Sequence, residues 1–404
     1  STRVRSSAAS DVYKRQKKYR QLTEWFYLCC LAIFFITIYI NGTTMVDQIT
    51  YFNKLIFLRI EQAVTLLVMG KIVLLDKYPR KLTIKLLLIF MLITYICYRA
   101  RAYEPLFYTV FLIGAKDVDF RKILKLYLTF GIPIFIVSAW LALNDYILNL
   151  TLQRPGDNTV RIALGNYSPS DAAAHIFYFM LAYALLKRFK WNIPEIISGI
   201  ALLICVYTLT ATKLDEILII LILLLCAGGY KYAVKFIQRF SLKQVRWGLW
   251  IYAVINVMLP LMFNPNSRIW SIINTLSSAR LFFGQVAYHD YAIPLFGQFV
   301  YQNGNGSIKP GEAYFFIDSS FVRALLMYGL VFFVVAMFYI ISSIESNIKQ
   351  RNYNLVIALI LVLLSSAIDN HLWDMAFNIV FLGMFADVQS DNEIVGIENE
   401  SNTK

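Results

Sequence analysis

Apolar runs long enough to cross a lipid bilayer recur along this chain, and they restrict its fold more than any other feature. A membrane-spanning helix needs about 20 apolar residues, and such runs return from residue 23 to residue 388. Hydrophobic residues make up 58% of the 404 positions and charged residues only 16%. A water-soluble domain cannot bury so much apolar surface. The sequence therefore predicts an all-α polytopic membrane protein.

The apolar pattern divides the chain into about 12 expected membrane-spanning helices within one transmembrane domain, residues 17–388. The expected spans are residues 23–41, 55–75, 82–98, 103–116, 122–143, 170–187, 194–211, 213–229, 245–263, 319–343, 354–370 and 372–388. A polar cytoplasmic tail is expected at residues 389–404. Residues 1–16, STRVRSSAASDVYKRQ, resemble translated sequencing-adapter sequence and are set aside as a non-native leader.

Basic residues are distributed unevenly between the expected loops. Counted from a cytoplasmic N-terminus, the inner loops hold most of them, at residues 14–20, 77–81, 116–125, 187–190, 231–246, 349 and 351. Cytoplasmic loops carry such an excess of Lys and Arg, so we expect both termini inside. The net charge of +13 (38 basic minus 25 acidic residues) follows from this bias, and we expect no nucleic-acid partner.

Two of the expected outer loops are long, residues 144–170 and 264–318. The second is the larger, lies between the ninth and tenth expected spans, and is rich in Asn, Gly, Ser and aromatic residues. Loops of that length are usually functional or disordered. Its aromatic residues favour an ordered loop that lies against the membrane.

Arginines in the outer loops oppose the charge bias, so each requires an explanation. One explanation is that their side chains reach the phosphates of the bilayer headgroups. The other is an anion site, because the planar guanidinium matches phosphate oxygens bidentately. Several arginines converge on the two long loops, which favours a site for a lipid-linked phosphate or diphosphate. Its candidate ligands are Arg154, Arg161, Arg280, Arg323 and Lys213.

Carboxylates and a histidine near the same loops are candidate general bases. Asp318 precedes an apolar run, where it can cap the helix or accept a proton from a sugar hydroxyl. Glu312 and His289 are the alternatives in the same loop. Asp369 and Arg59 are expected to line a cavity, because ionisable residues at membrane depth are functional candidates by default. Turn chemistry explains Asp369 almost as well.

No metal centre or disulfide framework is indicated. The five cysteines all lie in apolar runs, and the three histidines are far apart in the sequence. Neither set has the spacing of a zinc site or of paired cysteines. We expect no metal and no cofactor.

Five segments resemble motifs of the Wzy-type polysaccharide polymerases, particularly those of Gram-positive exopolysaccharide and capsule clusters. GAKDVDFRKILK is similar to the inner amphipathic loop of that family, and RIALGNYSPSDAAA to its external segment from an arginine to His-Pro-Asn. SARLFFGQVAYHDYAIPLFGQ resembles the start and end of its large outer loop, and IDSSFVRALLMYGLVFF its Asp-x-x-[Tyr/Phe] helix start. DNHLWDMAFNIVFLGM resembles its last helix pair. The resemblance covers most of the chain from about residue 85 onward.

The resemblance implies a metal-independent, GT-C-like glycosyltransferase of the bacterial cytoplasmic membrane. It would polymerise oligosaccharide repeat units carried on undecaprenyl diphosphate into an exopolysaccharide, capsule or O-antigen at the outer face. Arg161 and Arg280 would hold the donor diphosphate, and Asp318 matches the aspartate at the loop end. Besides the lipid bilayer, the implied partners are a chain-length regulator and a flippase of the same pathway.

The chain departs from the family pattern at three places. The triplet 168–170 is Ser-Pro-Ser instead of His-Pro-Asn, Lys213 stands where relatives often have Arg, and Asp369 stands where Glu is expected. These differences put the identity of the base in doubt more than the anion site.

Two other functions fit the same pattern. A ligase of the O-antigen type would transfer a finished glycan to another acceptor, and only its product distinguishes it from a polymerase. A polysaccharide flippase or transporter also suits 12 spans. Such transporters usually show paired broken helices or an internal repeat, and no internal repeat is evident in this sequence.

Overall fold

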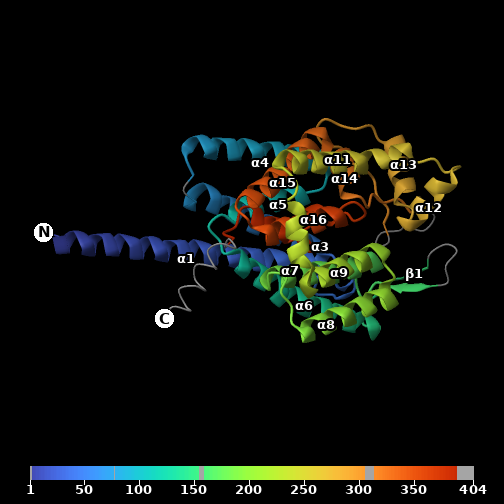
Figure 1. The fold of residues 1–404 in the computed structure, drawn as a ribbon, viewed down its shortest axis with the longest axis horizontal. Helices are drawn as coiled ribbons and strands as arrows, with labels where there is room; N and C mark the ends of the chain where they lie inside the picture. Colours follow the sequence, from blue (N-terminus) through green and yellow to red (C-terminus); the bar gives the residue numbers. More distant parts are fainter. Residues whose placement is uncertain (1, 77, 154–158, 305–313, 389–404) are drawn as a thin grey trace.

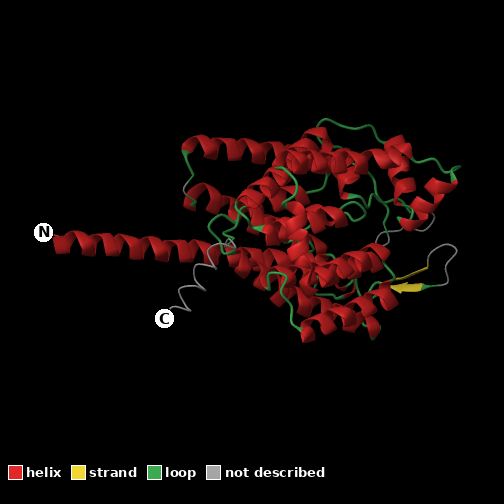
Figure 2. Cartoon of the chain, in the orientation of Figure 1, coloured by secondary structure: helices red, strands yellow, loops and turns green. Residues whose placement is uncertain are grey.

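The computed structural model describes residues 2–76, 78–153, 159–304 and 314–388, with side chains described from residue 18 onward. Within these residues the regular secondary structure is helical apart from one short antiparallel pair of strands (Figures 1 and 2). The α-helices are α1 (Thr2–Asn41), α2 (Met45–Gln48), α3 (Lys54–Gly70), α4 (Arg80–Ala100), α5 (Glu104–Gly114), α6 (Phe120–Leu143), α7 (Pro169–Leu186), α8 (Ile193–Cys205), α9 (Lys213–Leu224), α10 (Tyr230–Ile237), α11 (Leu242–Met262), α12 (Arg268–Leu276), α13 (Arg280–Asp290), α14 (Ser320–Arg323), α15 (Gly329–Lys349) and α16 (Tyr353–Ser365). The shorter elements are the π-helical turns η1 (Lys71–Leu75), η2 (Val206–Thr210), η3 (Leu225–Gly229) and η4 (Ala324–Tyr328), the 3-10 turns η5 (His371–Trp373) and η6 (Val380–Met384), and the strands β1 (Thr151–Gln153) and β2 (Val160–Ile162).

Several helices begin where the sequence supplies a polar cap. The Asn53 carboxamide oxygen accepts from the backbone N–H of Leu55 at 2.8 Å, at the start of α3. At α8, Asn192 and Glu195 cap each other's backbone N–H groups reciprocally, and Ser241 does the same with Gln244 at α11. These bonds satisfy donors that the first turn of a helix leaves without an intrahelical partner.

Seven helical segments of the described residues are long and apolar enough to cross a membrane. They are Lys18–Asn41, Arg80–Ala100, Phe120–Leu143, Ile193–Thr210, Lys213–Ile237, Leu242–Met262 and Ser320–Lys349. The expected helical class, with helices able to cross a membrane, is therefore confirmed, whereas the count of 12 is not reproduced. Two of the expected spans form only α5 and α16, with 11 and 13 residues, which is short of the roughly 20 that a bilayer requires.

The prediction of a final membrane-spanning helix at residues 372–388 is wrong. This segment holds two short 3-10 turns, η5 and η6, joined by irregular backbone. Polar side chains compete with a helix here: the Asn378 side chain donates to the Leu372 carbonyl at 2.9 Å and accepts from the Val380 N–H at 3.1 Å. Asp374 likewise accepts from the Ala376 N–H at 2.8 Å. Local bonds of this kind offer the backbone an alternative to helix.

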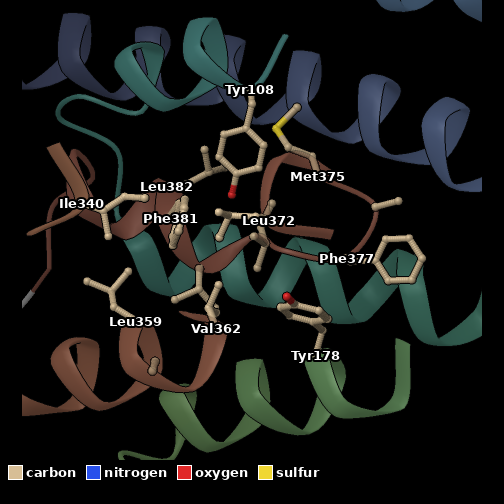
Figure 3. Close-up of a cluster of buried hydrophobic side chains, with 14 of the residues drawn as sticks. Tyr108, Tyr178, Ile340, Leu359, Val362, Leu372, Met375, Phe377, Phe381 and Leu382 are labelled. Atoms are coloured by element: carbon tan, nitrogen blue, oxygen red, sulfur yellow. The ribbon is translucent and has the colours of Figure 1, made fainter. Parts of the chain in front are cut away.

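The apolar side chains of this final segment fill the protein core instead of facing lipid. Figure 3 shows Leu372, Met375, Phe377, Phe381 and Leu382 surrounded by side chains from other helices. Those five residues are at most 7% exposed. The neighbouring side chains come from α5, α7, α15 and α16, namely Tyr108, Tyr178, Ile340, Leu359 and Val362. A hydropathy pattern does not distinguish a segment buried in protein from one buried in lipid.

The long connection between α11 and α14 is ordered where it is described. It contains α12 and α13 and then an extended run that pairs with the broken start of α15. The Gly297 N–H donates to the Tyr328 carbonyl at 3.0 Å, and the Leu330 N–H donates to the Pro294 carbonyl at 2.9 Å. The π-helical turn η4 leaves these backbone groups outside the usual helix pattern, so the connection supplies their partners.

Gly329 is required at the junction between η4 and α15. Its φ of 91° and ψ of 167° lie in a region that only glycine adopts readily. A Cβ atom there would lie 2.8 Å from the Leu295 carbonyl oxygen and 2.9 Å from the Gly297 nitrogen. The extended run thus approaches the helix more closely than any side chain allows.

We therefore expect Gly329→Ala to lower the thermal unfolding midpoint of the detergent-solubilised protein. The backbone strain alone costs about 1–3 kcal/mol, and the contact with backbone atoms adds to it. Gly248→Ala in the middle of α11 is the matched control, because a Cβ atom there meets nothing within 4 Å. Since alanine is the better helix former, the control should be neutral or stabilising. Equal midpoints for the two variants would contradict the requirement.

Candidate functional site

The centre of the candidate site is Arg280, the first residue of α13, whose side chain lies between two carboxylates. Its Nη2 atom donates to Asp369 Oδ1 at 3.3 Å, and its Nε atom lies 3.6 Å from Asp318 Oδ2. The Nε–H has no hydrogen-bond partner among the described residues. The Asp369 side chain is 4% exposed and that of Asp318 is 23% exposed. Asp369 is therefore the buried anchor of Arg280, and Asp318 is its more accessible partner.

A tight turn between α12 and α13 sets the position of Arg280. Ser278 and Ala279 both adopt left-handed backbone conformations, with φ of 54° and 64°. Asn274 holds this turn from both sides, because its carbonyl accepts from the Ala279 N–H at 2.8 Å and its side chain accepts from the Phe282 N–H at 3.1 Å. The first residue of α13 is thereby held in a defined direction.

Ser320 brings the two carboxylates together from distant parts of the chain. Its hydroxyl donates to the Asp369 carbonyl at 2.5 Å and accepts from the Leu372 N–H at 3.2 Å, and its own N–H donates to the Asp369 carbonyl at 3.2 Å. Ser320 follows Asp318 by two residues, so these bonds tie the start of α14 to the turn that carries Asp369. The serine itself is buried.

Two further aspartates and a histidine complete a polar cluster around this centre. Asp171 lies in the first turn of α7, and its Oδ1 atom is 3.5 Å from Nε2 of His371. Asp215 lies in the first turn of α9, is buried, and interacts electrostatically with both Asp369 and Arg280. We call Asp171, Asp215, Arg280, Asp318, Asp369 and His371 the Arg280 cluster. Its members come from four helix starts and one turn.

This cluster lies at the end of the molecule opposite the N-terminal end of α1. Thr43, just beyond the C-terminal end of α1, forms a backbone bridge with Asn166, three residues before α7 begins. Asp171 is therefore near that end of α1, while the N-terminus projects from the other side of the helices (Figure 1).

Burial dominates the electrostatics of the cluster. It raises the pKa of Asp318 to about 6, although the nearby Arg280 charge opposes the change. Burial also raises the pKa of Asp369 against the same positive charge. For His371, burial by itself lowers the pKa, but the hydrogen bond to Asp171 and the surrounding carboxylates raise it above its ordinary value. The cluster therefore favours bound protons.

The His371 ring is fixed in an aromatic stack that crosses the core. It stacks on Phe377 with ring centroids 3.6 Å apart, and Phe377 stacks on His175 at 3.9 Å. Tyr39 of α1 continues the stack from His175 at 4.4 Å. Together with Asp171, this packing determines the orientation of the His371 ring.

Arg323 belongs to a second polar group and does not contact Arg280. Its Nη1 atom donates to Gln302 Oε1 at 3.3 Å, and its guanidinium lies over the ring of Phe316 at 5.5 Å. Arg323 also interacts electrostatically with Glu104, to which Tyr328 donates a hydrogen bond at 3.4 Å. Arg323 was one of the expected phosphate ligands, but its guanidinium already contacts other side chains.

Arg161 and Lys213 lie on either side of the segment that leads into α9. Arg161 lies on β2, and its Nε atom donates to the Thr210 carbonyl at 2.7 Å. The Thr210 hydroxyl lies 3.2 Å from that of Thr212, the N-cap residue of α9. Arg161 therefore holds the start of the helix that carries Asp215. Lys213 is exposed at the same helix start.

Two expected site residues are elsewhere. The His289 side chain is 87% exposed and pairs with Asp290 at 2.9 Å, at the opposite end of α13 from Arg280. Arg59 is exposed and donates to Gln62 at 2.9 Å, and its expected place in a cavity stays a prediction. Glu61, two positions on, is the buried residue instead, since i and i+2 point to different faces of a helix. Arg154 and Glu312 lie outside the described residues.

The sequence interpretation missed the contribution of Asp215 and His371. Asp215 follows Lys213 by two positions and was not among the expected site residues, yet it is buried. The available signal was its position: an ionisable residue at the start of an apolar helix is a functional candidate in a membrane protein. The position of His371, between Asp369 and Asp374 in a short polar interval, was a similar signal.

Fold and site together define a mostly helical protein with segments able to cross a membrane and a buried charged cluster at one end of them. Comparisons with protein-family models, curated proteins and solved structures find no match to this chain.

Proposed function

We propose that this chain is a polytopic glycosyltransferase that polymerises oligosaccharide units carried on undecaprenyl diphosphate. In this proposal both termini are cytoplasmic and the Arg280 cluster faces the outer side of the bacterial cytoplasmic membrane. The excess of basic residues in the loops at the other end supports that orientation. The resemblance of the sequence to Wzy-type polymerases supports the substrate class.

The observation that carries the proposal is the arrangement of Arg280 between Asp369 and Asp318. A guanidinium whose Nε–H has no hydrogen-bond partner can donate to a second anionic ligand. Asp369 is buried and holds the arginine in place, while the longer 3.6 Å contact to the partly exposed Asp318 is the one that a diphosphate can replace. Replacement would release the Asp318 carboxylate next to the bound donor.

The reaction then uses Arg280 and the released Asp318. The acceptor hydroxyl attacks the anomeric carbon of the donor sugar, and a new C–O bond forms. The bond from that carbon to the phosphate oxygen breaks, and its electron pair leaves with the lipid diphosphate. Arg280 stabilises the charge that grows on the leaving group, with Arg161 as the second candidate ligand. Asp318 accepts the hydroxyl proton.

Deleting the gene in cells that make the polymer tests this function against its alternatives. We expect single lipid-linked repeat units to accumulate at the outer face and longer chains to disappear. Single units confined to the inner face would indicate a flippase and overturn the proposal. Long chains that remain on the lipid carrier would indicate a ligase and overturn it as well. The readout is the size and location of the lipid-linked glycans.

His289→Ala is expected to leave the chain-length distribution unchanged. The side chain is almost fully exposed and is separated from Arg280 by the length of α13. Electrophoresis of the polymer from cells that carry the variant measures the effect. A loss of long chains in this variant would assign the proton acceptor to His289 and would remove Asp318 from that role.

A further inference from the structure

The last part of the apolar segment Lys213–Ile237 is a short helix, α10, at the opposite end of α9 from Asp215, and it differs from α9 in direction and composition. The chain leaves α9 through the π-helical turn η3, where Gly228 has a φ of 111° and open space around its Cβ position. This glycine is therefore needed for the bend and not for close packing. In Figure 1, the short yellow-green helix that follows, α10, runs across the long axes of α9 and α11.

Two stripes of residues with a spacing of four run along α10 (Tyr230–Ile237) and the turn that follows it, before α11 begins at Leu242. Tyr232, Phe236 and Phe240 form one stripe, and they are 64%, 58% and 43% exposed. Lys231, Lys235 and Arg239 form the adjacent stripe. Residues four apart lie on one face of a helix, so within α10 Tyr232 and Phe236 form an aromatic face beside the basic face of Lys231 and Lys235. Phe240 and Arg239 follow in the exposed turn after the helix. None of the residues of α10 is buried in the protein.

The cations of this segment have no carboxylate partner among the described residues. Lys231, Lys235, Arg239 and Lys243 form no ion pair there. Arg246, one turn further, behaves differently: it pairs bidentately with Glu345, with both N–O distances 2.7 Å. That arginine joins α11 to α15, whereas the others are available to an external anion.

We propose that residues 230–247 form a binding surface for anionic phospholipid headgroups. Half-exposed aromatic rings suit the boundary between headgroups and acyl chains. An adjacent row of unpaired Lys and Arg attracts a negatively charged leaflet. A helix that lies across the spanning helices places both stripes along the bilayer surface. Charge complementarity selects anionic over zwitterionic lipid. The length of α9 separates this surface from Asp215 of the Arg280 cluster. The lipid proposal therefore does not depend on the function proposed for that cluster.

Lipid titration of the purified full-length protein by native mass spectrometry tests the proposal. The wild-type chain should bind phosphatidylglycerol more tightly than phosphatidylcholine. The variant K231Q/K235Q/R239Q should lose that preference by about tenfold or more, because each basic residue near the surface contributes about a fivefold factor. The variant F236S/F240S should weaken the binding of both lipids.

The matched control is R59Q/R99Q/R268Q, which removes three exposed charges that lie on other helices. It has the same net charge as the first variant, so it should keep the preference for the anionic lipid. Equal binding of the two lipids by the wild-type chain, or an equal loss in both triple variants, would overturn the proposal. Unchanged lipid preference in K231Q/K235Q/R239Q would also overturn the proposal. It would indicate that these residues bind an acidic protein partner instead of lipid.

Discussion

Substituting Arg280 by alanine is expected to reduce polymer formation at least about 100-fold, the range seen when one charge-stabilising donor of a transition state is removed. The same variant should be less stable, because Asp318 and Asp369 would keep their positions without a cation. Removing one partner of a buried ion pair typically costs about 3–5 kcal/mol. Chain length from cells and the thermal unfolding midpoint of the purified protein measure the two effects separately.

Arg280→Lys separates the catalytic effect from the structural one. Lysine keeps the positive charge between the two aspartates, so most of the stability should remain. It loses the planar fork that binds Asp369 and a phosphate at the same time, so polymer formation should still fall. Arg268→Ala, an exposed arginine at the start of α12, is the matched control and should affect neither quantity. Normal chain length in both Arg280 variants would remove the diphosphate site from this position.

Substituting Asp318 by asparagine is expected to reduce the polymerisation rate by about 100-fold or more, the usual contribution of a general base. Asparagine keeps the shape of the side chain but accepts no proton. Fold and donor binding should be retained, because Asp369 remains as the anchor of Arg280. Accumulation of single lipid-linked units in cells with folded variant protein measures the effect. A normal polymerisation rate in this variant would exclude Asp318 as the base.

The pH dependence of the same residue gives a second readout. The pKa of Asp318 is about 6 in the folded protein, above the ordinary value of about 3.9. The folded state therefore binds more protons than the unfolded state between these values, and the contribution of Asp318 to stability falls as pH rises through that window. The polymerisation rate should rise as pH increases through about 6, because the base must be ionised. Asp318→Asn should lose both dependences, and their persistence would assign them to another group.

The candidate site was only partly predictable from the residues. Arg280 was identified because it opposes the charge bias of the outer loops, and Asp318 because it precedes an apolar run. Asp369 was identified because ionisable residues at membrane depth are functional candidates. Arg59 satisfied the same rule as Asp369, and His289 was an alternative base in the long loop, yet both side chains are exposed and neither belongs to the cluster. The rule reports the type and membrane depth of a residue, whereas the direction of a side chain depends on how each helix packs against its neighbours.

Local sequence determined the helical class, the apolar spans and several helix starts, because hydropathy and capping act over a few neighbouring residues. The tertiary structure decided which apolar segments face other side chains. Residues 372–388 are as apolar as a membrane span, yet they fold as 3-10 turns in the core. The tertiary structure also determined which residues form the Arg280 cluster. Asp171, Asp215 and Asp369 meet only because α7, α9 and the turn after α16 pack together. Contacts between residues so far apart along the chain leave no periodic pattern in the sequence.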